Sequence, residues 1–164
     1  MSAGLADFFK YNLWANQTLL DFCEPLTGAQ LDASAAGVYG SVRELLVHIF
    51  DSEEGYAGRL SGELPSPRLS DLPTFPSFAE LRRRAQWSGE ALIQYAEQGD
   101  WGQIFHLDDG TYDAPAFIIL IQAINHAIDH RSQIATVLSQ QGIELPDLAG
   151  WGYNDAVVTP ENLK

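Results

Sequence analysis

The chain has 164 residues, a length typical of one domain with a sizeable buried core, and we expect a single domain over residues 1–164. Hydrophobic residues make up 46% and charged residues 19%, which excludes a disordered chain and favours a globular one. A formal net charge of −13 would repel a phosphate backbone, so we expect no nucleic-acid partner.

The sequence also indicates where the protein works. Its single cysteine, Cys23, cannot form an intramolecular disulfide and suits a reducing cytoplasm. The first seven residues lack a basic patch followed by an apolar run, so no secretory signal is expected. The longest apolar stretch, residues 116–121, is far shorter than the roughly 20 residues that a membrane-spanning helix needs. We expect a cytoplasmic protein without a membrane partner.

The first half of the chain predicts two helices. Apolar residues at helical spacing predict the first over about residues 4–24, and Pro25 ends it. A polar connection rich in alanine follows. Ser41 begins the second helix, about residues 41–61, because Glu44 stands three residues later and completes a capping-box pattern.

A loop then separates the second helix from the third. Four prolines that cannot continue a helix mark this loop: Pro65, Pro67, Pro73 and Pro76. The third helix is predicted over about residues 76–98. Its run of three arginines, residues 82–84, is the only basic cluster, and we interpret it as a solvated face that balances nearby acids.

The last part of the chain predicts a hairpin and a fourth helix. Residues 104–112 form two short β-prone runs around Asp108-Asp109-Gly110, which is a turn signal. Pro115 opens the most apolar helix, about residues 115–141, and the tail from Ile143 is expected to be irregular. Four long helices with short to moderate connections predict an all-α, antiparallel four-helix bundle with a small hairpin between helices three and four.

Three of the four histidines are candidate metal ligands. His126 and His130 are four residues apart and therefore lie on one face of the fourth helix. This spacing alone is ambiguous, because such pairs arise by chance and buried histidines usually make core hydrogen bonds. His48 lies among apolar residues of the second helix, and bundle cores commonly build metal sites from facing helices. Three imidazoles would hold zinc, nickel, copper or iron and leave a coordination position for water or a thiol.

Other residues near the histidines have weaker signals. The zinc-protease pattern His-Glu-x-x-His is excluded because position 127 is alanine, so the glutamate that acts as the base is missing. Asp51 stands three residues after His48 and is either a base, an acceptor that orients an imidazole, or a solvated residue. Asp129 has the same ambiguity, and His106 on the hairpin is interpreted as a surface residue.

At these positions the chain resembles the DinB family of metal-dependent four-helix bundles. The resemblance lies in three segments: Tyr11-Asn12-Leu13-Trp14-Ala15-Asn16, then Ser41-Val42-Arg43-Glu44-Leu45-Leu46-Val47-His48-Ile49, then His126-x-x-x-His130-Arg131-Ser132-Gln133-Ile134 with Leu138 and Gly142-Ile143-Glu144-Leu145-Pro146. The family commonly has glycine where this chain has Ser132, a departure that leaves the histidines untouched.

The resemblance implies several properties that the residues alone do not establish. It implies an up-down-down-up bundle, often dimeric, with a divalent metal, usually zinc or nickel, held by His48, His126 and His130. Relatives of this type include transferases and isomerases that use low-molecular-weight thiols such as bacillithiol or mycothiol.

We therefore expect a homodimeric metal-dependent enzyme that acts on a small molecule, of the thiol S-transferase or hydrolase type. Its site is expected within the bundle, fronted by the hairpin and the proline-rich loop, with Asp51 as the candidate base. The alternative is a stress-related bundle that binds a metal or ligand without catalysis. The lack of an obvious general base favours this alternative.

Overall fold

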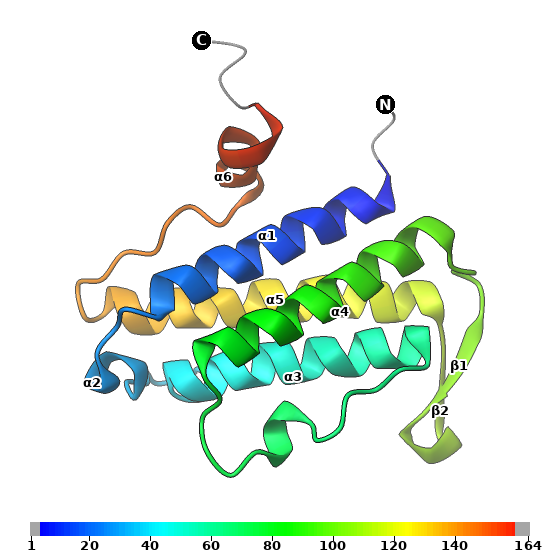
Figure 1. Cartoon of the computed structure of the whole chain (residues 1–164), viewed down its shortest axis with the longest axis horizontal. Helices are drawn as coiled ribbons and strands as arrows, with labels where there is room; N and C mark the ends of the chain where they lie inside the picture. The colour runs from blue at the N-terminus through cyan, green and yellow to red at the C-terminus, as the bar shows by residue number, and fades with distance from the viewer. Residues whose placement is uncertain (1–3, 160–164) are drawn as a thin grey trace.

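Four long helices make up most of the protein in the computed structural model, which describes residues 4–159 (Figure 1). They are α1 (Leu5–Cys23), α3 (Val42–Ser61), α4 (Phe78–Gln98) and α5 (Ala116–Ser139). Each of these helices begins and ends within two residues of its predicted first and last residue. Residues 1–3 and 160–164, at the two ends of the expected domain, lie outside the described residues. Residues 1–3 also belong to the N-terminal segment in which no secretory signal is expected.

The helices run up, down, down and up. Figure 1 shows α3 and α4 running in the same direction, with α1 and α5 antiparallel to them. The parallel pair requires a long crossover, and residues 62–77 return along the bundle to supply it. Helix α1 packs against α4, and α3 packs against both α4 and α5. The predicted all-α, up-down-down-up four-helix bundle is confirmed.

The hairpin between α4 and α5 is also confirmed. Strand β1 (Ile104–Leu107) pairs antiparallel with β2 (Tyr112–Pro115). At the turn, Asp108 and Asp109 have φ values of 50° and 54°, and aspartate is among the few residues that accept this left-handed region. Within residues 4–159, no helix is long and apolar enough to cross a membrane.

Two connections contain short helical turns beyond the four predicted helices. The connection after α1 holds α2 (Gly28–Leu31), whose first turn is capped by Thr27 and Gln30. This is the same capping-box signal that placed the start of α3, so it was available in the sequence. In the proline-rich loop, η1 (Leu69–Asp71) forms one 3-10 turn.

The tail differs from its predicted irregular course. It forms α6 (Gly150–Tyr153) and a π-helical turn, η3 (Asn154–Val158). The Tyr153 ring lies against the rings of Tyr11 and Trp14, with centroid distances of 5.9 and 5.4 Å. Contacts with α1 therefore hold the turn, and contacts of this kind leave no periodic pattern in the tail itself.

The arginine run of α4 is not wholly a solvated face. Arg83 is exposed and pairs with Glu80, as expected of a surface residue. Arg84 is buried, and its Nη1 donates to both carboxylate oxygens of Glu54 on α3, at 3.0 and 3.1 Å. Its Nη2 donates to the carbonyl oxygen of Pro67, so this arginine ties α3, α4 and the proline-rich loop together.

The Glu80 ion pairs predict an acid-sensitive contribution to stability. Hydrogen bonds from Arg83 and then Arg84 lower the pKa of Glu80 from 4.5 to about 2. A folded-state pKa below the unfolded one stabilises the protein above about pH 4.5, and the gain is lost as pH falls toward 2. Because Glu80 is partly exposed, we expect Glu80→Gln to cost about 1 kcal/mol at pH 6 in urea unfolding. The cost should shrink below pH 4; a constant cost would contradict the assignment.

Candidate metal centre

The packing of α3 against α5 brings three imidazoles together. His48 comes from α3, and His126 and His130 come from successive turns of α5. The Nε2 atoms of His48 and His126 are 3.0 Å apart, and one nitrogen from each of the three rings lies within 4.8 Å of the others. Two nitrogens bound to one tetrahedral zinc ion, each at about 2.0–2.1 Å, would be roughly 3.3 Å apart. The cluster therefore has dimensions that fit a single ion.

Burial disfavours the charged form of two of these imidazoles, those of His48 and His126. Burial, followed by the neighbouring His130 and His48, lowers the pKa of His126 to about 4. Burial, followed by His130, also lowers the pKa of His48. His130 is only 8% exposed, and its buried Nδ1 has no hydrogen-bond partner within residues 4–159. Neutral rings have free lone pairs, and a buried nitrogen without a partner costs free energy unless something binds it.

Aromatic rings cover the cluster. Tyr39 stacks on His48 with a centroid distance of 4.0 Å and an interplanar angle of 15°, and its edge meets His130 at 5.7 Å. The backbone N–H of Tyr39 donates to Oε1 of Gln133 at 2.8 Å, which ties the loop before α3 to α5. The ring of Tyr56 lies edge-on to His126 at 5.9 Å.

Asp51 lies one turn beyond His48, but its carboxylate is engaged elsewhere. It accepts hydrogen bonds from Arg68 Nε at 3.1 Å, from Arg68 Nη2 at 2.9 Å and from the backbone N–H of Ser70 at 3.1 Å. Its negative charge acts on His48 by raising the pKa of that imidazole, against the larger effect of burial. Its role as a base stays a prediction.

The two other candidates lie at the surface. Asp129 is exposed and accepts a hydrogen bond from Gln133 Nε2 at 3.2 Å. His106 has a side chain that is 72% exposed, and its Nδ1 lies 2.6 Å from Asp113 Oδ1 across the hairpin. His106 is therefore separate from the three-histidine cluster, which makes it a matched control.

A buried polar network lies beside the cluster and starts at Arg131, the residue after His130. Arg131 is 4% exposed, and its Nη1 donates to Oδ1 of Asn12 at 2.8 Å and of Asn16 at 2.7 Å. Both asparagines donate through Nδ2 to Oε2 of Glu53 at 2.8 Å. Ser88 Oγ donates to the other oxygen of Glu53 at 2.6 Å. The network joins all four long helices.

The two charges of this network are strongly desolvated. Burial raises the pKa of Glu53, and burial lowers the pKa of Arg131. Arg131 and the two asparagines lie in the segments that resemble the DinB family. Glu53 was not predicted as a site residue. The missed signal was its position on the apolar face of α3, between Ile49 and Ala57, where a carboxylate requires hydrogen-bond partners.

A groove of about 900 Å³ leads to His48 from outside the bundle. It lies between the first half of α3 and the proline-rich loop, which contributes Phe75, and Tyr39 lines it as well. Arg43 crosses it, with its guanidinium 4.9 Å from the centre of the Phe75 ring and an ion pair to Asp32. No lining residue comes from the hairpin, which lies where α4 ends and α5 begins (Figure 1). The expectation that the hairpin fronts the site was therefore wrong for this groove.

The fold and the site together define a class of protein: a four-helix bundle with a three-histidine cluster between two of its helices. The DinB family model matches residues 1–161, and the chain belongs to that family. The chain is 23% identical over 144 residues to Protein DinB of Bacillus subtilis (strain 168), covering 82% of this chain and 84% of that protein.

Two solved structures share the fold. A crystal structure of a DinB-like protein from Bacillus subtilis has a TM-score of 0.60 and 19% identity, covering 88% of this chain and 96% of that one. A DinB family member from Shewanella denitrificans also has a TM-score of 0.60, with 16% identity, covering 95% of this chain and 90% of that one.

Proposed function

We propose that the protein binds one divalent metal ion through His48, His126 and His130. The observation that carries this proposal is the convergence of three imidazole nitrogens from two packed helices, within 4.8 Å of one another. Imidazole is a common ligand of zinc and nickel, and these are the two metals that we propose.

We further propose that the metal-bound protein acts on small molecules as a thiol S-transferase or a hydrolase. Such an ion, when bound, supplies a Lewis acid with an open position for a thiol or water. The groove beside His48 supports this proposal, because its volume of about 900 Å³ suits a small-molecule substrate. We propose a cytoplasmic setting, which the lone buried Cys23 supports.

Metal titration of ligand variants tests the proposed site. We expect His48→Ala, His126→Ala and His130→Ala each to weaken zinc or nickel binding by about 100-fold or more, since each removes a ligand. The fourth histidine supplies the control, because His106→Ala should bind metal like the wild type. Calorimetric titration and metal analysis of purified protein measure both. Equal metal binding by all four variants would contradict the proposed site.

Turnover separates the enzyme from its non-catalytic alternative. Metal-loaded protein is screened for conjugation of glutathione, bacillithiol and mycothiol to electrophiles, and for hydrolysis of small esters. Activity that His126→Ala abolishes supports the enzyme, and inertness of the metal-loaded protein in every assay supports a metal-binding protein without catalysis. In the same screen, an Asp51→Asn variant with unchanged turnover would remove Asp51 as the base.

We also propose that two copies of the chain form a homodimer through the outer face of α5. Phe117, Ile121, Ile124 and Ile128 recur at helical spacing, and three of them are exposed. An exposed apolar stripe is uncommon on a surface this acidic, and a symmetric dimer would cover it.

A single charge in this stripe should separate the two copies. Ile121 is 58% exposed, so Ile121→Glu places a carboxylate in the proposed interface without disturbing the core. We expect light scattering after size exclusion to give a dimer mass for the wild type and a monomer mass for this variant. Phe8→Glu, at an equally exposed site on α1, should remain dimeric. A monomeric wild type would contradict the proposal.

A further inference from the structure

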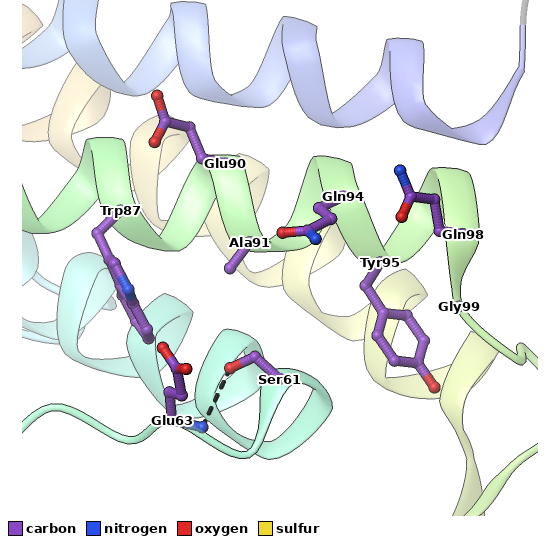
Figure 2. A pocket seen from close by; sticks show the side chains of 9 residues that line it. All are labelled: Ser61, Glu63, Trp87, Glu90, Ala91, Gln94, Tyr95, Gln98 and Gly99. Atoms are coloured by element: carbon purple, nitrogen blue, oxygen red, sulfur yellow. Dashed lines mark hydrogen bonds between the residues drawn. The ribbon is translucent and has the colours of Figure 1, made fainter.

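A second hollow lies between α4 and the end of α3 (Figure 2), whereas the histidines' groove is lined by the first half of α3. Its volume is about 460 Å³, within the range of sites that take small molecules. Its lining residues are Ser61, Glu63, Trp87, Glu90, Ala91, Gln94, Tyr95, Gln98 and Gly99. None of them belongs to the candidate metal centre.

The hollow arises from a pattern along α4. Trp87, Ala91 and Tyr95 are four residues apart and lie on one face of the helix. The two rings are separated by eight residues, a rise of about 12 Å, and the small side chain between them leaves the space open. In Figure 2, Trp87 and Tyr95 stand at the two ends of the hollow with Ala91 between them.

Both aromatic walls are held in place. The hydroxyl of Tyr95 donates to the carbonyl oxygen of Asp100 at 3.1 Å and contacts Gln103 Oε1 at 3.3 Å. Gly99 makes room for the ring, because a Cβ at this position would lie 2.6 Å from two of its carbons. Trp87 packs against the buried core formed by α1, α3, α4 and α5. A ligand would therefore meet preformed surfaces.

Two glutamates, Glu63 and Glu90, line the hollow, and no basic residue within residues 4–159 does. Glu63 lines the hollow together with Trp87, and a hydrogen bond from its backbone N–H to Ser61 Oγ, 3.2 Å long, fixes the turn (Figure 2). Glu90 points away toward α1 and accepts a hydrogen bond from Gln86 at 2.6 Å. The site thus combines two aromatic rings with the negative charge of Glu63.

We propose that this hollow binds a small organic ammonium ion that carries an aryl or alkyl extension. The ammonium group would lie between the Trp87 ring and the Glu63 carboxylate, where cation–π attraction and ion pairing act together. The apolar extension would cross Ala91 toward Tyr95. This proposal does not depend on the metal site.

Nuclear magnetic resonance titration with (2-phenylethyl)trimethylammonium tests the proposal, since a quaternary ion has no lone pair with which to bind a metal. We expect a saturable shift of the Trp87 indole N–H signal, assigned with Trp87→Phe, and a millimolar Kd. The neutral analogue 2-phenylethanol should bind about fivefold more weakly or worse, because it lacks the cation. No saturable shift up to roughly 50 mM, or equal binding of the alcohol, would overturn the proposal.

Substitutions of two glutamates test which carboxylate contributes to binding of the quaternary ion. Glu63→Gln should weaken binding of the quaternary ion by about threefold or more, whereas Glu97→Gln, with the same change in net charge on α4 but outside the lining, should leave it unchanged. Ala91→Leu should abolish binding by filling the space between the rings. Equal weakening by both glutamate variants would indicate a general effect of the acidic surface and overturn the site.

Discussion

Arg131→Met is expected to lower the free energy of unfolding by about 3–5 kcal/mol at pH 8. The substitution keeps most of the buried volume but removes the positive charge that faces Glu53 through Asn12 and Asn16. A buried carboxylate then remains without a compensating charge, which is more costly than the loss of a surface ion pair. Urea unfolding of wild type and variant measures the difference.

The pH dependence of this loss follows from Glu53. Burial raises its folded-state pKa above the unfolded value of 4.5, whereas the charge of Arg131 lowers it. A raised carboxyl pKa means that the folded state holds more protons than the unfolded state, so stability falls as pH rises through the window between the two values. Removing Arg131 raises the folded-state pKa of Glu53 further, so the window extends to higher pH. The cost of Arg131→Met should therefore be smaller at pH 5 than at pH 8.

A second substitution separates the charge from the packing. Glu53→Gln in the Arg131→Met background removes the unpaired charge and keeps an amide where Asn12, Asn16 and Ser88 need a partner. We expect the double variant to regain at least half of the lost stability. Arg83→Met, at an exposed position, should cost under about 1 kcal/mol. A loss at Arg131 that is independent of pH and unrelieved by the second change would contradict this account.

Local signals explain why so much of the fold could be predicted. The start of α3 follows from Ser41 and Glu44, whose side chains form the capping hydrogen bonds in the structure. The hairpin follows from its Asp-Asp-Gly turn. The tail could not be predicted in this way, because Tyr153 is held by rings of α1 that lie far away in the sequence.

Residues of the candidate site also differ in whether a local pattern predicts them. His126 and His130 share a helix, so their spacing alone places them on one face, and the packing of α3 against α5 adds His48. Tyr39 has no such pattern, because it lies in a loop and reaches His48 only through the fold. Glu53 was predictable in principle, since a carboxylate on an apolar helix face needs a partner, but its hydrogen-bond partners come from two other helices, α1 and α4.

Zinc at a free concentration of about 1,000 times its Kd is expected to raise the free energy of unfolding by about 4 kcal/mol. Binding to the folded state alone produces this gain, and the unfolded chain cannot hold the three imidazoles within 4.8 Å. His126→Ala and His130→Ala should lose the gain, whereas His106→Ala should keep it because that ring lies on the exposed hairpin. Thermal or urea unfolding with and without zinc measures each case.

The acidic surface offers a competing explanation, and the choice of cation separates the two. A net charge of −13 attracts any divalent cation and can stabilise the folded chain by reducing repulsion between carboxylates. Magnesium and calcium prefer oxygen ligands and should reproduce a surface effect, but not one that depends on imidazole. Stabilisation that zinc and nickel produce, that calcium does not, and that vanishes in His126→Ala would therefore assign the effect to the histidine cluster. Equal stabilisation by calcium in wild type and His126→Ala would assign it to the surface instead.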